Sequence, residues 1–164
     1  MFTHILAPID GSDCSNRAFE VALRLAKSEN ASLTACYVVD AVQAASPALG
    51  PYGSLQPWLD ALTEAGNQTL TDAVAQGAKV GVTVRAELQD GGPVSCISEL
   101  AKTIKADLIV MGSHGRGGIA RLLMGSVAEG VMRSAICPVM VVRDVSAAST
   151  NYAPAKANSL STSG

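Results

Sequence analysis

The chain has 164 residues, of which 48% are hydrophobic and 16% are charged, and its formal net charge is −2. This composition excludes a wholly disordered chain, which would combine few hydrophobic residues with a high net charge. Twelve basic residues against fourteen acidic ones, with only 4% aromatic residues, argue against a dedicated nucleic-acid-binding protein. No membrane helix is expected, because Gly, Pro or charged residues interrupt every apolar stretch.

The amino-terminal residues and the cysteines predict a cytoplasmic protein. The first basic residue is Arg17, whereas a secretory signal opens with a basic region. The four cysteines are widely spaced and form neither a CxxC pair nor a metal-ligand pattern. We therefore expect reduced thiols and a cytoplasmic location.

The first half of the chain predicts two strand–helix units separated by a long loop. Hydrophobic residues recur at helical spacing between 15 and 28, and Asn30 is expected to end this helix. Three prolines and two glycines within 40–57 predict a loop, and a loop of this length is usually functional or loosely ordered. The expected elements are a buried strand at 3–9, the helix at 15–28, a strand at 31–39 and a helix at 58–79 that buries Leu59, Leu62, Gly66, Leu70, Ala73 and Val74.

The second half continues the alternation of strands and helices. Residues 82–88 alternate between apolar and polar, as an edge strand does, whereas 107–111 form an apolar run typical of a strand buried on both faces. Ser126 and Glu129 match a capping box, which predicts a helix with Ser126 as its N-cap. The other expected elements are a helix that opens at Pro93, a glycine-rich loop at 112–118, a short turn at 122–124 and a strand at 138–142.

This order of elements predicts one α/β domain with a doubly wound parallel sheet and helices on both faces. Ligands bind such sheets beyond the carboxyl ends of the strands, where the strand order reverses. The loops at 8–12 and 112–118 leave two such ends. Residues from 144 onward are rich in Ser, Ala and Asn, and we expect them to form a flexible tail.

The glycine-rich loop has the chemistry of a phosphate site. Its glycines let backbone N–H groups approach a ligand, and Gly125 and Ser126 precede a helix whose first N–H groups attract anions. Arg116 adds a fixed positive charge with a planar fork suited to phosphate. The loop is neither a Walker A motif, since no Gly-Lys-Ser/Thr occurs, nor a GxGxxG motif.

Three separated motifs resemble the universal stress protein family. Gly112-x2-Gly115-x9-Gly125-Ser126 is similar to the nucleotide signature of the ATP-binding branch of that family. The stretches ILAPIDGS at 5–12, MGSHGRGG at 111–118 and SAICPVMVV at 134–142 also match the family pattern. The resemblance implies a five-stranded sheet in the order 3-2-1-4-5 and a nucleotide-binding domain over residues 1–143.

The resemblance also implies a set of ligand contacts. ATP phosphates would run along Gly112, Gly115, Gly125, Ser126 and Val127, while adenine and ribose would lie near Pro8, Asp10, Val38 and Met111. Asp10 could bind the ribose, the base or a Mg²⁺ ion, or it could instead cap the following helix. His114 could bind a phosphate or only orient the turn, and His4 is expected to be structural.

The sequence is compatible with three functions. The first is a regulatory ATP-binding protein with slow or no hydrolysis, read by an unknown protein partner, because neither a general base nor a lysine clamp is evident. The second is a nucleotide enzyme, since residues 10–15 loosely resemble the loop of pyrophosphatase-type ATPases without its leading Ser-Gly-Gly. The third is an interaction module that binds no nucleotide. No catalytic residue is assigned.

The last strand predicts how the protein assembles. Residues 138–142 are short and apolar, and the family order places them at a sheet edge, where an unpaired strand promotes aggregation. Pairing this edge across a two-fold axis would remove that exposed edge. We therefore expect a homodimer through residues 138–143, as the resemblance also implies.

Overall fold

The structure is a computed structural model, and it describes residues 1–41, 56–115 and 124–143. Arg116, most of the predicted loop at 40–57, most of the turn at 122–124 and the predicted tail from 144 lie outside the described residues. The described elements are β1 (His4–Pro8), α1 (Asp13–Glu29), β2 (Ser32–Val39), α3 (Gln56–Val80), β3 (Val84–Asp90), α4 (Pro93–Thr103), β4 (Leu108–Gly112), α5 (Ser126–Ser134) and β5 (Val139–Val142).

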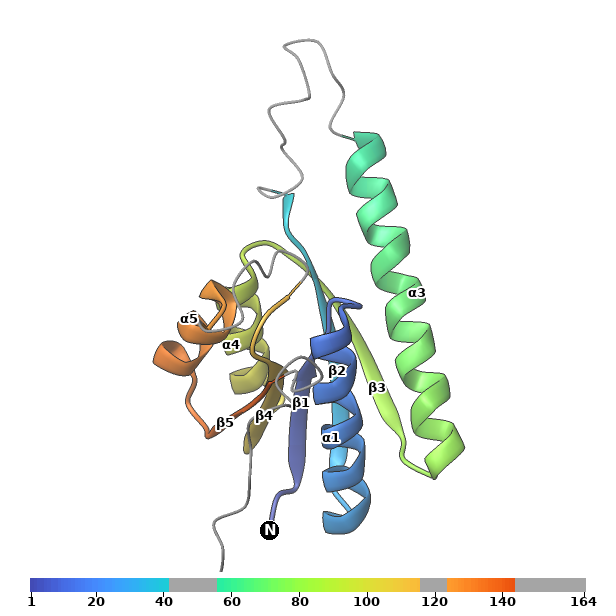
Figure 1. Cartoon of the computed structure of the whole chain (residues 1–164), viewed down its shortest axis with the longest axis vertical. Coiled ribbons are helices and arrows are strands. Elements are labelled where there is room, and N and C mark those ends of the chain that lie inside the picture. Colours follow the sequence, from blue (N-terminus) through green and yellow to red (C-terminus); the bar gives the residue numbers. More distant parts are fainter. Residues whose placement is uncertain (42–55, 116–123, 144–164) are drawn as a thin grey trace, which may run out of the picture.

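The five strands form one parallel sheet in the order β3-β2-β1-β4-β5. Helices α1 and α3 cover one face of the sheet, and α4 and α5 cover the other (Figure 1). The predicted fold class and strand order are therefore confirmed. Strands β1 and β4 are neighbours, but the chain continues from β1 to α1 on one face and from β4 to α5 on the other face. This divergence opens a crevice between the two strand ends in this class of fold.

The central strands bury side chains on both faces. In β1, Ile5 and Ala7 pack under α1 and α3, whereas Leu6 packs under α4 and α5. In β4, Leu108 and Val110 face α1 and α3, and the alternate residues of the strand face the other layer. Double burial explains why these strands have apolar runs instead of alternating patterns.

Several element boundaries differ from the predictions. Helix α1 begins two residues early, because the Ser12 side chain caps it by accepting from the Ser15 N–H at 3.3 Å. Asn30 ends α1 in the left-handed conformation with φ of 55°, as predicted. Strand β3 begins at Val84 because the Val82 N–H still bonds the Gly77 carbonyl at 2.9 Å, which holds the preceding turn to the end of α3.

The buried face of α3 was predicted in part. Gly66, Leu70 and Ala73 are buried as expected, and Leu59 and Leu62 are partly buried against the core. Val74, however, is 39% exposed, and Gly77 is buried instead. Gly77 lies so close to β3 that an added Cβ would collide with the side chain of Val84. The close approach of this helix to the sheet selects glycine over a larger apolar residue.

None of the described helices is both long enough and apolar enough to cross a bilayer.

Candidate functional site at the carboxyl ends of β1 and β4

The two loops expected to share a crevice do meet in the structure. Strands β1 and β4 pair directly, with Ile5 opposite Leu108, so their carboxyl ends lie at the same edge. Gly115 lies so close to the β1–α1 turn that an added Cβ would collide with Oδ2 of Asp10. Residues 105 positions apart in the chain therefore lie in direct contact. A side chain at position 115 would have to displace the Asp10 carboxylate.

Hydrogen bonds of Asp10 fix the turn between β1 and α1. Its Oδ1 accepts from the N–H of Ser12 at 3.0 Å and from the hydroxyl of Ser12 at 2.6 Å. The N–H of Asp10 donates to the Ser15 hydroxyl at 3.3 Å. Gly11, between the two residues, has φ of 80°, a conformation that favours glycine. Of the two roles left open for Asp10, the structure shows the turn-forming one, while a ligand contact remains a prediction.

Gly112 has a packing role at the end of β4. A Cβ on this residue would lie 3.1 Å from the carbonyl oxygen and from Sγ of Cys14, in the first turn of α1. The Cys14 thiol in turn donates to the Val142 carbonyl at 3.4 Å and lies 3.6 Å from the Ser113 hydroxyl. Glycine at 112 therefore lets α1 pack against the strand, whatever its relation to phosphate.

Ser113 connects three elements beneath the glycine-rich loop. Its N–H donates to the Val142 carbonyl of β5 at 2.8 Å, and its carbonyl accepts from the Gly125 N–H at 2.8 Å. Its hydroxyl lies 3.0 Å from Nδ1 of His114, while Nε2 of His114 is buried without a hydrogen-bond partner among the described residues. Both ends of the loop are thus tied together at Gly125, and one histidine nitrogen retains unused hydrogen-bonding capacity.

The predicted capping box at α5 is wrong. Gly125 is the N-cap, Ser126 is the first helical residue, and no side chain caps this helix. Glu129 does not reach back but pairs with Arg133 at 2.6 Å. Gly125 approaches the Ser113 carbonyl, where an added Cβ would lie at 3.1 Å, and this approach fixes the start of the helix one residue early. The N–H groups of the first turn, including those of Ser126 and Val127, therefore lack a side-chain cap.

Two of the residues predicted to lie near adenine and ribose, Val38 and Met111, share one side of the sheet. Met111 is buried within the cluster under α4 and α5, and Val38 packs against that cluster while remaining partly exposed, as does Val127, which was predicted to contact phosphate. Pro8 is buried at the end of β1. Strand ends from β1, β2 and β4 and the first turn of α5 thus come together around an apolar surface of the kind that covers a purine ring.

The described site offers little ionisable chemistry. Burial, with smaller contributions from Cys96 and Glu87, raises the pKa of the Cys36 thiol beneath Val38 to about 12, so this thiol is protonated at neutral pH. Burial likewise raises the pKa of Cys96 and of Cys137. No group of three His, Cys, Asp or Glu side chains that could hold a metal occurs in residues 1–41, 56–115 and 124–143.

Sequence reasoning missed three residues that organise the site. Ser12, Cys14 and Ser113 were not predicted as site residues, yet they hold the turn, the α1 contact and the two ends of the loop. Ser12 lies in a polar turn, a signal for capping that could have identified it. The roles of Cys14 and Ser113 depend on contacts with distant segments, which leave no local pattern.

The sheet is parallel, and the turns that follow its neighbouring strands β1 and β4 contain tightly packed glycines. These features define a protein of the Rossmann-like class. Within that class, the profile of the Universal stress protein family matches residues 1–143, and the chain belongs to this family.

Individual relatives agree with this assignment. Universal stress protein MJ0531 of Methanocaldococcus jannaschii is 40% identical over 145 residues, which cover 87% of this chain and 83% of that protein. The solved structure of the universal stress protein UspA from Lactobacillus plantarum is 34% identical with a TM-score of 0.76, covering 86% of this chain and 97% of that one. A crystal structure of a universal stress protein in complex with cAMP is 29% identical with a TM-score of 0.61, covering 87% of this chain and 97% of that one.

Proposed function

We propose that this universal stress protein binds an adenine nucleotide, ATP with Mg²⁺, at the carboxyl ends of β1, β2 and β4. It acts as a cytoplasmic regulatory protein with slow or no hydrolysis, whose nucleotide state is read by a protein partner. The observation that carries the proposal is the start of α5, where Gly125 lies against the Ser113 main chain and no side chain caps the helix, which leaves a main-chain surface there. Phosphate binding by main-chain N–H groups at a helix start requires such a surface.

The chemistry of the ligand follows from what surrounds the glycines. The apolar surface at Met111, Val38 and Val127 suits a purine, and a relative of this chain is known in complex with cAMP. The buried Nε2 of His114 is a candidate partner for a phosphate oxygen. The four cysteines are free, which supports the cytoplasmic location.

Binding of Mg²⁺ would depend on the nucleotide. Mg²⁺ is usually held by one or two carboxylates together with substrate phosphates, and Asp10 is the carboxylate of the described site. Its Oδ1 accepts two hydrogen bonds from Ser12, which hold the carboxylate at the turn beside Gly115. We therefore expect Mg²⁺ to bind with ATP and not before it.

Two glycines in equivalent positions provide the test. Gly125 and Gly92 are both N-caps with extended backbone, at φ of −67° and −70° respectively. A Cβ at Gly125 would meet the main chain of Ser113, whereas at Gly92 it would meet only the Ser95 hydroxyl. Gly125→Ala should weaken ATP–Mg binding in calorimetry, and Gly92→Ala should leave it unchanged. Equal affinities for the two variants would contradict the proposal.

Mass spectrometry of small molecules released from freshly purified protein would identify the resident nucleotide. Recovery of AMP, ADP, ATP or cAMP supports the proposal and decides among them. Protein that is free of nucleotide and shows no rise in melting temperature with millimolar ATP–Mg would favour an interaction module instead. Pyrophosphate release that depends on an added substrate would favour the enzyme alternative.

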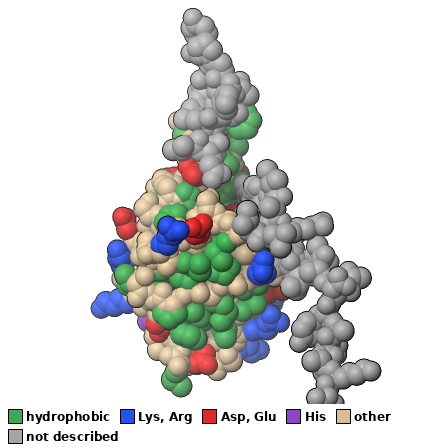
Figure 2. Space-filling model, turned by 60° about the vertical axis from the view of Figure 1, so that its left-hand side comes forward, with side chains coloured by type: hydrophobic (Ala, Val, Ile, Leu, Met, Phe, Trp, Pro, Cys, Tyr) green, Lys and Arg blue, Asp and Glu red, His purple; other side chains and the backbone are tan. Residues whose placement is uncertain are grey.

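We further propose a homodimer through residues 138–143. Strand β5 is the sheet edge and pairs with β4 alone among the described strands. Met132, Ile136 and Met140 nearby are 44%, 60% and 37% exposed. Figure 2 shows hydrophobic side chains gathered on the face that carries α5 and β5. An apolar edge of this kind is protected when a second copy covers it.

Light scattering would test the dimer. Met140→Lys places a charge on the edge strand and should convert the dimer to a monomer at micromolar concentrations. Val74→Lys is the matched control, because Val74 is 39% exposed but lies on α3, away from the edge. A parent protein that is monomeric at tens of micromolar would contradict this part of the proposal.

A further inference from the structure

A cavity lies between the first turns of α1 and the middle of α3. Its volume is about 200 Å³, and none of the residues predicted to bind the nucleotide lines it. Helices α1 and α3 lie on the same face of the sheet (Figure 1). Pockets for drug-sized ligands have volumes of about 300–1,000 Å³, so this cavity suits a smaller ligand.

The lining of the cavity combines an apolar floor with a polar rim. Ile9, Phe19 and Ala73 are buried and belong to the core under α1 and α3. The polar side chains of the lining are Asn16, Thr69, Asp72 and Gln76. Asp72 is the only charged residue of the lining, and no basic side chain is present there to attract an anion.

The hydrogen bonds already made leave an acceptor on each polar residue of the rim, beside the amide donors of Asn16 and Gln76. The Thr69 hydroxyl donates to the Ala65 carbonyl at 2.7 Å, so its remaining capacity is that of an acceptor. Oδ1 of Asp72 accepts from the Gln68 amide at 3.0 Å, and Oδ2 is not engaged by this bond. The carboxamides of Asn16 and Gln76, which line the same cavity, have no hydrogen-bond partner within the described part of the chain.

We propose that this cavity binds the primary ammonium group of a small aliphatic amine, either a free amine or a lysine side chain, with Asp72 as its counter-charge. An ammonium group has three donors and no acceptor, which matches the carboxylate, the hydroxyl and the carboxamide oxygens of the rim. The aliphatic stem packs on Ile9 and Phe19. A divalent metal fits less well, because a single carboxylate lines the cavity.

The start of α1 does not oppose a cation at this position. A helix amino terminus carries a partial positive charge, which would repel an ammonium group. The first turn of α1, however, contains Asp13, and the Ser12 side chain caps it. The charged residue of the lining is Asp72, which lies on α3, across the cavity from α1.

The test is an NMR titration of the full-length, ¹⁵N-labelled protein with n-butylammonium chloride. We expect shifts at the side-chain amides of Asn16 and Gln76 and at the Gly11 N–H. Asp72 is exposed at the rim, so Asp72→Asn should weaken binding by about two- to fivefold, as loss of an exposed charge pair does. The neutral n-butanol, of similar size, should bind more weakly than n-butylammonium by a similar factor.

A matched aspartate on the same helix is the control. Asp60 accepts from Gln56 four residues earlier at 2.8 Å, as Asp72 does from Gln68, but it does not line the cavity. Asp60→Asn should keep the parent affinity, and Gln76→Ala should lower it. Equal binding of n-butanol, equal affinity in Asp72→Asn, or an equal loss in Asp60→Asn would overturn the proposal.

A second ligand distinguishes the two sources of the ammonium group. N-acetyl-lysine-N′-methylamide presents the same group on a peptide-like stem. Tighter binding of this compound than of n-butylammonium supports a lysine side chain of a partner, and weaker binding supports a free amine. Absence of shifts with both compounds would overturn the proposal, and neither outcome bears on the nucleotide site.

Discussion

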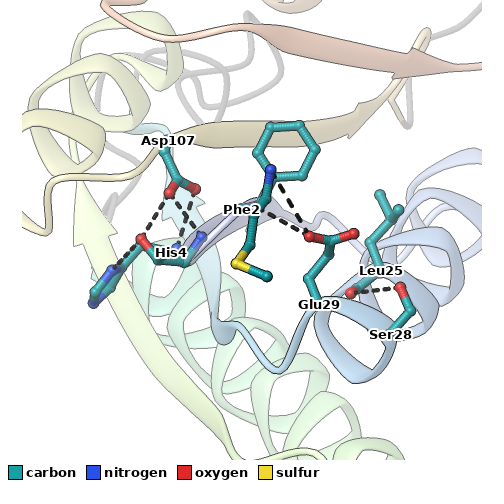
Figure 3. A network of polar contacts seen from close by, with 8 residues as sticks. Phe2, His4, Leu25, Ser28, Glu29 and Asp107 are labelled. Atoms are coloured by element: carbon teal, nitrogen blue, oxygen red, sulfur yellow. Dashed lines mark hydrogen bonds and ion pairs between the residues drawn. The ribbon is translucent and has the colours of Figure 1, made fainter.

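The two ends of the sheet satisfy their main-chain N–H groups in different ways. At the amino end, side chains do so: Asp107 accepts from the N–H and hydroxyl of Thr3, both at 2.7 Å, and from the N–H of His4 at 3.1 Å. Glu29 accepts from the Phe2 N–H at 3.3 Å, and Figure 3 shows both carboxylates directed at the start of β1. At the carboxyl end, side chains accept from main-chain N–H groups in the β1–α1 turn, where Asp10 Oδ1 and Ser12 Oγ do so, but not at α5, which begins at Gly125 without a side-chain cap.

This difference predicts that substitutions at the two ends of the sheet affect different properties of the protein. Carboxylates of the protein close the amino end, so substitutions there should change the free energy of unfolding and leave nucleotide affinity alone. The N–H groups in the first turn of α5, at the carboxyl end, have no side-chain cap and remain available to a ligand, so substitutions beside them should change affinity more than stability. Substitutions at each end of the sheet can test this expectation.

The largest effect is expected at Gly115. Gly115→Val forces the Asp10 carboxylate to move and puts a branched side chain beside the predicted phosphate position, so we expect ATP–Mg affinity to fall by more than about a hundredfold, with an overpacking cost to stability of about 1–3 kcal/mol. Calorimetry with ATP–Mg measures the loss. If the collision is the cause, Gly115→Val should add little to the loss in an Asp10→Ala background. Additive losses would instead indicate that the valine excludes the ligand directly.

Arg116 should have the next largest effect. The residue lies outside the described part of the chain, so its role follows from the sequence: one or two charge-assisted hydrogen bonds to phosphate. Arg116→Ala should cost about 1.5–3 kcal/mol, or about ten- to hundredfold in ATP affinity, without lowering the melting temperature. Arg133→Ala is the control, since Arg133 pairs with Glu129 on the surface of α5. Parent-like affinity in Arg116→Ala would remove this residue from the site.

The fold and the meeting of the two loops could be predicted because their signals are local or shared by all proteins of this class. The alternation of elements and the apolar run of β4 indicate the parallel sheet, and Asn30 indicates the end of α1. The glycine-rich loop indicates where the proposed site lies, which stays a prediction. These features depend on chain neighbours and on the general rule for strand ends.

Contacts between distant segments could not be predicted. Ser126 and Glu129 fit a capping box by spacing, but Gly125 takes the N-cap because it meets Ser113 across the loop. Val74 fits the apolar face of α3, but the approach of the helix to β3 buries Gly77 instead. Asp107 and Thr3 are 104 residues apart, and their pairing depends on the adjacency of β1 and β4.

Asp107 should have the largest effect at the amino end. Asp107→Ala removes three accepted hydrogen bonds at a partly exposed position and should destabilise the protein by about 1–2 kcal/mol with unchanged ATP affinity. Chemical denaturation measures the change. Asp60→Ala, at an exposed position on α3, is the control and should stay within about 0.5 kcal/mol. A loss of nucleotide binding in Asp107→Ala would break the division between the two ends.

The effect of Asp107 should depend on pH. Partial burial tends to raise its pKa, but the hydrogen bonds from Thr3 and His4 outweigh it and hold the pKa below the ordinary value of 3.8. A carboxylate with a lowered pKa stabilises the fold above its unfolded pKa and ceases to do so once protonated. The difference between the parent and Asp107→Ala should therefore be constant above about pH 5 and should shrink as the pH falls through the lowered folded value. A difference that grows on acidification would contradict this assignment.

Glu29 should have the smallest effect. Its carboxylate accepts from the Phe2 N–H and lies 4.0 Å from the amino-terminal ammonium of Met1, which is 85% exposed. Glu29→Gln keeps an acceptor for Phe2 and removes only a surface ion pair, so the expected loss is below about 0.5 kcal/mol. Salt screens such pairs, and the loss measured by denaturation should disappear at high ionic strength. A larger loss than in Asp107→Ala would mean that the end of α1, and not the start of β4, is the main anchor of β1 at this end of the sheet.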